Sequence, residues 1–217
     1  MLIDHTHPLY VKKRNAKPEN KYNGAYYYSR DIVNYIIPNV KTDRNWVTVR
    51  LPEVKTPDHS IVFIHNNRNP NYYSYLKDVK DCVLVCSTPA TYENMKFFSD
   101  KAILLPLSVN VRAVERYKVK EKTKEMAFAG RRCKITNKVP SKADILTDMP
   151  QTQLIKEMAK YKKIYAVGRT AIQANILGCE IGVYDNMYLD SKFWQVLDCK
   201  DAAKILQEIL NIFDKKE

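Results

Sequence analysis

The sequence predicts an α/β protein made of two Rossmann-like halves, each built on a parallel sheet, and three observations support this fold class. Short runs of continuously apolar and β-branched residues recur along the chain, which is typical of strands covered on both faces. Segments with helical spacing of apolar residues alternate with these runs, as they do in βαβ units. Residues 106–124 combine a proline with a strongly charged stretch, and they divide the 217 residues into two parts of ordinary domain size.

The first half contains four predicted strands, over residues 46–51, 61–64, 82–86 and 102–105. Residues 71–79 and 91–98 lie between them and have the spacing of short helices. A further helix is expected over residues 29–37, with Ser29 as its N-cap and Pro38 at its end. A serine oxygen can accept from the first N–H groups of a helix, and a proline disfavours its continuation.

The second half repeats the pattern, with strands predicted over residues 126–129, 144–147, 164–167 and 181–184. Helices are predicted over residues 151–161, 170–177 and 201–212, and Asp201 complements the dipole at the start of the last helix. We expect residues 1–106 and 107–217 to form two domains that face a cleft. One continuous doubly wound sheet is the alternative.

Charge is the unusual property of this sequence. Lys and Arg outnumber Asp and Glu by 36 to 24, which gives a net charge of +12. Residues 116–142 alone carry a net charge of +8, and such a field attracts polyanions or phosphorylated ligands. Arg132, Lys134 and Lys138 in this basic run are candidates for binding a polyanion. The alternative is that the run only keeps the protein soluble.

Other features exclude several classes of protein. No uncharged apolar run approaches the roughly 20 residues that a membrane helix needs, and the first ten residues lack the basic and apolar regions of a signal peptide. The five cysteines have no CxxC spacing, which favours reduced, buried thiols over a zinc site or a disulfide framework. We therefore expect a cytoplasmic protein, and the sequence leaves its oligomeric state open.

A glycine-arginine pair follows one of the predicted strands in the second half. Gly168 and Arg169 come directly before the helix that starts near Thr170. The first turn of a helix offers unpaired N–H groups to an anion, glycine lets a ligand approach the backbone, and arginine adds a fork for phosphate. This segment therefore predicts a phosphate site, with an ordinary strand-to-helix turn as the alternative.

A second pair, Gly130 and Arg131, follows the strand predicted over residues 126–129. The carboxyl ends of parallel strands border the crevice in which ligands bind to sheets of this kind. We expect both glycine-arginine pairs to face one cleft, although a solvated basic loop is the alternative for the second pair.

Residues 127–131 (AFAGR) and 168–178 (GRTAIQANILG) resemble the nucleotide-sugar-binding half of the GT-B glycosyltransferases, and residues 103–110 (ILLPLSVN) resemble the Pro-x-x-Val-Asp entry into the C-terminal domain of that family. The resemblance implies a nucleoside-diphosphate sugar as donor substrate and no required cofactor, and it leaves metal dependence open. By this resemblance the donor-binding residues are Gly130, Arg131, Gly168, Arg169, Thr170 and Gln173.

The sequence departs from the family at two positions. Gln173 stands where the family has the glutamate that binds the donor ribose, and it can still hydrogen-bond a hydroxyl but without the charge. Tyr165 stands where the family has the partner glutamate. The chain is also short for a member of this family, so a minimal enzyme and a relative that binds without catalysing are both open.

A transferase also needs a group that orients or deprotonates the acceptor, and in GT-B enzymes this group comes from the N-terminal half. His65 is the first candidate, because it follows a predicted strand and histidine titrates near neutrality. Asp31 and Asp58 are further candidates, although both can instead cap helices or turns. Tyrosines gather at residues 26–28 and 72–75, where they can stack on bases or sugars or pack in the core. The sequence predicts no metal site.

The predicted function is the transfer of a sugar from a nucleoside-diphosphate donor to a hydroxyl acceptor. The basic surface suits a polyanionic acceptor, either modified DNA or a wall-polymer precursor, and small phage enzymes of GT-B architecture that glucosylate DNA provide an analogy for the first. The alternative is a catalytically inactive nucleic-acid-binding or inhibitory protein on the same scaffold. A nucleotide-binding regulator is a third possibility.

Overall fold

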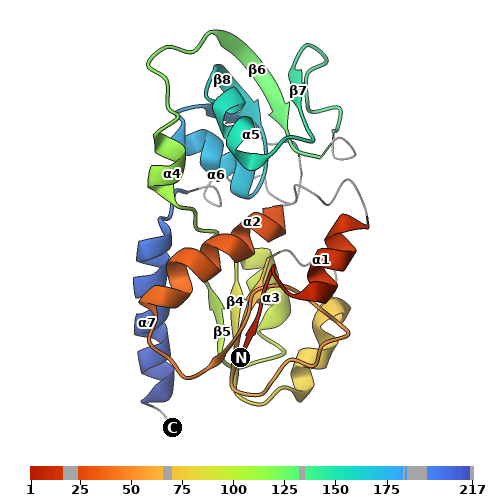
Figure 1. Ribbon diagram of the computed structural model, residues 1–217, viewed down its shortest axis with the longest axis vertical. Coiled ribbons are helices and arrows are strands. Elements are labelled where there is room, and N and C mark those ends of the chain that lie inside the picture. The colour runs from red at the N-terminus through yellow and green to blue at the C-terminus, as the bar shows by residue number, and fades with distance from the viewer. Residues whose placement is uncertain (17–23, 66–69, 132–134, 183, 185–194, 216–217) are drawn as a thin grey trace. The chain divides into compact units, whose positions relative to one another are not determined.

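The computed structural model describes residues 1–16, 24–65, 70–131, 135–182, 184 and 195–215 (Figure 1). The chain divides into two compact units. Of the described residues, those within Met1–Ala16, Ala25–Leu107 and Cys199–Glu217 belong to the first unit, and those within Ser108–Asp198 belong to the second. Each unit has a parallel sheet, of five strands in the first and four in the second, which confirms the α/β fold class with two sheets.

The first sheet has the strand order β1-β2-β3-β4-β5, and all of its pairings are parallel. Its strands are β1 (Leu2–Ile3), β2 (Asn45–Val47), β3 (Ser60–Ile64), β4 (Cys82–Cys86) and β5 (Ala102–Leu104). Every residue of β3 and β4 is buried, as the continuous apolar runs predicted. β4 has the predicted bounds, whereas the strand predicted over residues 46–51 ends at Val47.

The helices of the first unit are α1 (Pro8–Asn15), α2 (Gly24–Asp31), the π-helix η2 (Ile32–Ile36), the 3-10 helices η3 (Ile37–Asn39) and η4 (Pro70–Asp78), α3 (Pro89–Met95) and α7 (Cys199–Asp214). α1 is absent from the sequence-based prediction. Its first turn holds a proline, and the ring nitrogen Nδ1 of His7 accepts from the Leu9 N–H.

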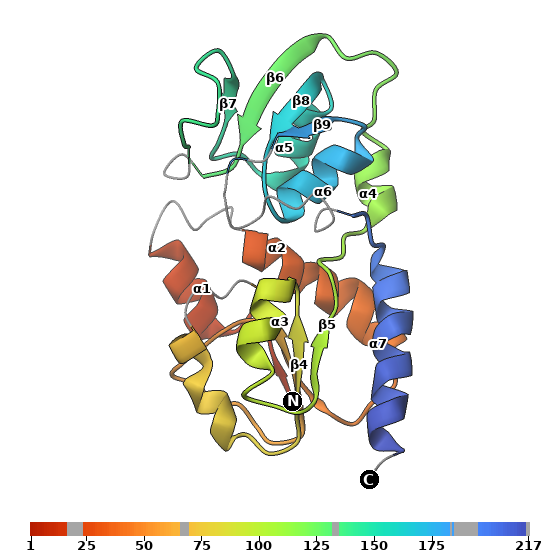
Figure 2. The same cartoon turned by 180° about the vertical axis from the view of Figure 1, so that it is seen from behind.

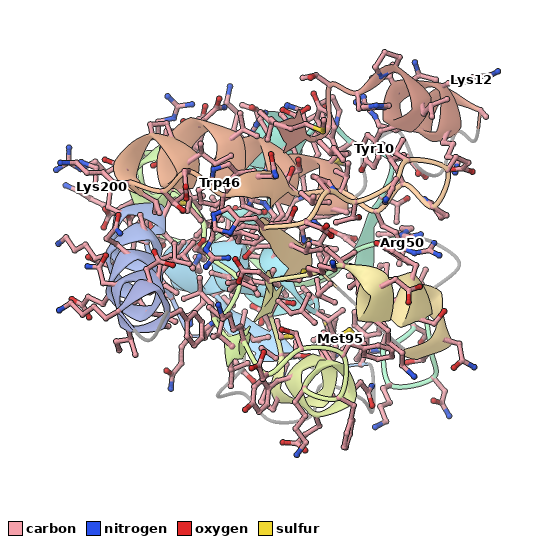
Figure 3. The ribbon with its side chains drawn as sticks, turned by 90° about the horizontal axis from the view of Figure 1, so that it is seen from below. Tyr10, Lys12, Trp46, Arg50, Met95 and Lys200 are labelled. Atoms are coloured by element: carbon pink, nitrogen blue, oxygen red, sulfur yellow. The ribbon has the colours of Figure 1, made fainter. Side chains whose placement is uncertain are left out.

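These helices cover both faces of the first sheet. On one face Leu76 of η4 and Met95 of α3 belong to the cluster that contains the inward side chains of β3 and β4. On the other face Tyr28 of α2 meets the edge of Phe63, whose ring stacks on Trp46 at a centroid distance of 6.3 Å. Figures 1 and 2 show α2 and α3 on opposite sides of the sheet, and Figure 3 shows Trp46 beside α2 and Met95 on α3.

The helix predicted over residues 29–37 starts earlier than expected. α2 begins at Gly24, so Ser29 lies inside the helix and is not its N-cap. The Ser29 hydroxyl lies 2.6 Å from the Thr48 hydroxyl and accepts from the His5 N–H at 3.1 Å, so tertiary contacts use the oxygen that a cap would need. Pro38 lies within the 3-10 turn η3, where the helical segment ends.

α7 packs on the first unit, where it contacts η2 and η3, so its contacts differ from the predicted grouping of residues 107–217. The side chain of Gln207 accepts from the Lys41 N–H and donates to the Lys41 carbonyl, at 2.5 and 3.2 Å. The fully buried Arg44 side chain donates to Asp81 at 2.7 Å and to Asp214, the last residue of α7, at 2.9 Å. One buried guanidinium thus joins α7 to the start of β4.

The second sheet has the strand order β7-β6-β8-β9, and its strands are β6 (Lys124–Ala129), β7 (Asp144–Leu146), β8 (Tyr161–Tyr165) and β9 (Glu180–Gly182). The unit also contains the helices α4 (Val111–Glu115), α5 (Gln151–Met158) and α6 (Arg169–Ile176). The chain runs from β6 outward to β7, and then returns past β6 to β8 and β9. The strand order therefore reverses between β6 and β8.

Part of the basic run of residues 116–142 stabilises the second unit. Lys122 Nζ donates to the carbonyls of Ala159 and Leu177, each at 3.1 Å, and these residues are the C-caps of α5 and α6. A cation at the negative ends of two helices is favourable. Lys124 Nζ lies 3.0 Å from the Tyr161 hydroxyl. Because these lysines precede or begin β6, they lie at the amino edge of the sheet, whereas Arg131 follows β6 at the carboxyl edge.

The Arg44→Met substitution tests the joint between α7 and the first sheet. It leaves Asp81 and Asp214 without their shared cation, and because both carboxylates keep some solvent we expect a loss of roughly 2 kcal/mol in the free energy of unfolding, less than for a fully buried pair. Urea denaturation measures it. Lys13→Met, which removes an exposed pair with Glu53, is the matched control and changes stability little. Equal losses in the two variants would contradict this role of Arg44.

The same cluster predicts how stability varies with pH. Although burial raises the pKa of Asp81, hydrogen bonds from Arg44, Lys101 and His59 outweigh it and hold this pKa well below 3.8. A hydrogen bond with Asp43 raises the pKa of His59 above 6.5 against the effect of burial, and Asp81 raises it further. The Asp81 contribution is lost as the pH falls below 3.8, and the His59 contribution as the pH rises through its folded pKa.

The difference in unfolding free energy between the natural protein and Asp81→Asn is therefore expected to be largest between these two ordinary pKa values, 3.8 and 6.5, and to shrink on either side. Urea denaturation of both proteins across a pH series measures it. A difference that does not change with pH would show that the charges of this cluster contribute nothing to folding.

Candidate nucleotide and acceptor sites

The two glycine-arginine pairs lie at the same edge of the second sheet. β6 and β8 are adjacent and parallel, with Ala127 opposite Ile164 and Phe128 opposite Tyr165. The turns that follow them, at Gly130 and at Gly168, therefore both leave the carboxyl edge. This is also the place where the strand order reverses, and in open α/β sheets ligands bind outside the carboxyl ends of the strands at such a reversal.

Gly168 makes the turn from β8 into α6. Its φ of 63° and ψ of −142° lie in a backbone region that favours glycine, and it is the N-cap of α6. A glycine has no side chain to accept from the first N–H groups of the helix, and no side-chain cap is present. α6 starts at Arg169, one residue before the predicted start, so Thr170 is its second residue and is half-buried. The first turn of α6 thus keeps the features of an anion site.

Arg169 is buried, which the sequence did not indicate. Only 9% of the residue is exposed, and its Nη1 donates to the Ser108 carbonyl at 3.4 Å. The guanidinium that the sequence predicted to bind phosphate therefore donates a hydrogen bond within the protein. This bond connects the segment before α4 to the start of α6. Arg131 is exposed and is the arginine of the two that solution can reach.

Gln173 lies one turn after Arg169 on the same face of α6, and it is 2% exposed. Among the described residues its Nε2 has no hydrogen-bond partner, and the same is true of the buried Ser108 hydroxyl. A buried polar group without a partner costs about 1–3 kcal/mol. Because helical side chains lean toward the N-terminus, the Gln173 amide leans toward the first turn of α6. The sequence missed Ser108, which is marked only by its place two residues after Pro106.

Gly130 is required for space. A Cβ at this position would lie 2.9 Å from Phe128 Cζ and 3.2 Å from the Tyr184 hydroxyl, and these two rings pack at a centroid distance of 5.1 Å. Of the predicted polyanion-binding residues, Lys138 is exposed, and its N–H donates to Thr136 Oγ1. The other two, Arg132 and Lys134, lie outside the described residues.

His65 follows β3 in the first unit, and its ring is held in one orientation. Nε2 donates to the Thr48 carbonyl at 2.5 Å, and the His65 carbonyl accepts from the Ser87 hydroxyl at 2.8 Å. Nδ1 therefore carries the lone pair, and it is buried without a hydrogen-bond partner in the described part of the chain. Burial lowers the pKa of His65 to about 4 against the effect of the Thr48 hydrogen bond. The expectation that His65 titrates near neutrality is wrong, and its ring is neutral at pH 7.

The two aspartates proposed from the sequence differ in their surroundings. Asp31 ends α2 and is 2% exposed, and Oδ1 lies 3.8 Å from the Arg30 guanidinium. Asp58 Oδ1 accepts from the Lys80 N–H at 2.9 Å, which fits a role in a turn. A catalytic role for His65 or Asp31 stays a prediction.

A chain of polar contacts leads to His65 from the N-terminus, and the sequence missed it. His5 Nδ1 lies 3.2 Å from the Ser29 hydroxyl, which lies 2.6 Å from the Thr48 hydroxyl, and the Thr48 carbonyl accepts from His65. His5, Thr48 and His65 follow β1, β2 and β3, so they lie at the carboxyl edge of the first sheet. β1 has only two residues, and its apolar pattern is too short to be recognised.

The comparisons with known proteins found no family model, no curated protein and no solved structure that matches this chain. Within the described ranges, no group of three or more His, Cys, Asp or Glu side chains is placed to hold a metal ion. In the same part of the chain no helix is both long and apolar enough to cross a membrane. The function is therefore argued from the geometry of the two sheet edges.

The pKa values of His65 and His59 are expected to be shifted in opposite directions. In NMR spectra of ¹⁵N-labelled protein, the ring nitrogens of His65 keep the shifts of the neutral Nε2–H form from pH 8 until the pH approaches its pKa of about 4, while His59 becomes protonated at a pH above the ordinary histidine pKa of 6.5. If His65 titrates between pH 6 and pH 7, the described burial of its ring is wrong.

Proposed function

We propose that the second unit binds a nucleoside-diphosphate sugar and that the protein is a GT-B-type glycosyltransferase that moves this sugar to a hydroxyl acceptor. One observation carries the proposal. Two glycine turns, at Gly130 and Gly168, leave the carboxyl ends of the two adjacent strands between which the strand order reverses.

The residues at this edge suit a diphosphate and the sugar ring of a nucleoside. The first N–H groups of α6 donate hydrogen bonds to phosphate oxygens. The exposed Arg131 adds a positive charge that stabilises the diphosphate as it leaves. The unpartnered Gln173 Nε2 and Ser108 hydroxyl supply hydrogen bonds for a ribose oxygen. Arg169 acts as a positioning residue, because it holds the Ser108 segment against α6.

In the transfer, the bond between the sugar and the diphosphate breaks and a bond to the acceptor oxygen forms, while the acceptor proton passes to a base. His65 offers a neutral lone pair on Nδ1 at the edge of the first sheet. With a pKa of about 4 it orients the acceptor hydroxyl better than it removes the proton. The reaction requires no redox cofactor.

Thermal-shift and calorimetric titrations with UDP, GDP, ADP and their common sugar conjugates test the proposal. We expect one nucleotide sugar to bind selectively, and Arg131→Ala to weaken that binding about tenfold, since a charge-assisted hydrogen bond is worth about 1.5–3 kcal/mol and this one is exposed. Arg112→Ala removes another exposed arginine of the second unit, on α4, and is the matched control. No binding of any nucleotide, or equal effects of the two substitutions, would contradict the donor site.

A second candidate function is nucleic-acid binding without catalysis. Gln173 in place of a glutamate favours it, and so do the exposed cations Lys118 and Lys120, which lie before β6 and away from the glycine turns. Binding of DNA that falls steeply with salt, in a protein that ignores nucleotide sugars, would support this function over the first.

A further inference from the structure

Two arginines of the first unit lie over two tyrosine rings. The Arg14 guanidinium carbon is 3.9 Å from the centroid of the Tyr26 ring, and that of Arg30 is 5.0 Å from the centroid of Tyr27. The two rings pack edge to face at 5.1 Å. Arg14 comes from the last turn of α1 and the other three residues from α2. These four half-buried residues are called the arginine-tyrosine surface below.

One of the two arginines of this surface, Arg14, has no carboxylate partner among the described residues. Its Nε is also buried without a hydrogen-bond partner in that part of the chain. Arg30, in contrast, forms an ion pair with the Asp31 carboxylate at 3.8 Å. In the same turn of α1, Lys12 points away from the sheet (Figure 3). A half-buried guanidinium without a carboxylate favours an anionic ligand.

The positive charges of Arg14 and Arg30 both affect the ring of His5. Burial lowers the pKa of His5, whose ring meets the edge of Tyr26 at 5.2 Å, and Arg30 and Arg14 lower it further against the effect of Asp4. Both arginines thus raise the electrostatic potential at one place. His5 is also the start of the polar chain that ends at His65, so the surface lies at the same sheet edge as the proposed acceptor-orienting group.

We propose that the arginine-tyrosine surface binds single-stranded nucleic acid, with the guanidiniums on phosphates and the tyrosine rings against bases. A stacked guanidinium is already oriented, so it loses little freedom when it binds a phosphate. Aromatic rings beside such cations suit bases, because every base has a flat face to stack. This inference rests on the proposed function in one respect, since it identifies the acceptor of the transfer as a nucleotide in a polyanionic strand.

Fluorescence anisotropy of a labelled oligothymidine, titrated with the full chain over a series of salt concentrations, tests this proposal. Arg14→Gln and Arg30→Gln are each expected to weaken binding about tenfold at low salt and to reduce the slope of log affinity against log salt by about 0.7, the value for one phosphate contact on a single strand. Tyr27→Leu weakens binding about tenfold without changing the slope, because stacking carries no charge.

Arg116→Gln is the matched control, since Arg116 lies over Tyr117 at 4.7 Å in the second unit. It is expected to leave the affinity unchanged. If Arg14→Gln does not fold, Arg14→Lys replaces it, because lysine keeps the charge but lacks the planar guanidinium. This variant is expected to bind more weakly with an unchanged slope of log affinity against log salt.

A loss of affinity in Arg116→Gln alone would move the binding site to the basic run and overturn this proposal. Failure of the natural protein to bind the oligonucleotide would overturn it too, even if a nucleotide sugar binds. Conversely, oligonucleotide binding with these variant effects in a protein that binds no nucleotide sugar would overturn the proposed transfer and leave the nucleic-acid surface intact.

Discussion

β6 and β8 run side by side in the same direction, and the remaining strands of the second sheet are added on either side of this pair. The parallel pairing brings two turns that are far apart in the sequence, at Gly130 and Gly168, to one edge. The strand order also reverses between β6 and β8, so the connections that leave these two strands run to opposite sides of the sheet. The geometry that suits a diphosphate thus follows from backbone hydrogen bonding.

The same constraint separates two groups of cations that the sequence presents as one basic run. Residues before β6 must lie at the amino edge, where Lys122 caps α5 and α6, and residues after β6 must lie at the carboxyl edge. The basic run is therefore divided between the two edges of the sheet, with Lys122 at the amino edge and Arg131 at the carboxyl edge. In the first unit, where β1, β2 and β3 are also parallel, Arg14 and Arg30 add charge near the carboxyl edge that holds His65.

Local patterns predicted most strands and several helices, because burial on both faces leaves a continuous apolar run. The bounds of β4 follow directly from it. The contacts of α7 do not, since Arg44 and Asp214 are 170 residues apart and nothing local records their pairing. The glycines of the candidate site were predicted because each comes directly after a predicted strand and before an arginine. The burial of Arg169 was not predicted, because its partner Ser108 is 61 residues away in the sequence.

NMR mapping of a bound nucleotide on the backbone tests whether the carboxyl edge of the second sheet binds a diphosphate. When ¹⁵N-labelled protein is titrated with a nucleoside diphosphate, we expect the largest amide shifts at Gly130, Arg131 and the first turn of α6, with small shifts at Lys122 and Lys124. If the largest shifts fall instead on residues before β6 or on the arginine-tyrosine surface, the carboxyl edge of the second sheet is not the nucleotide site.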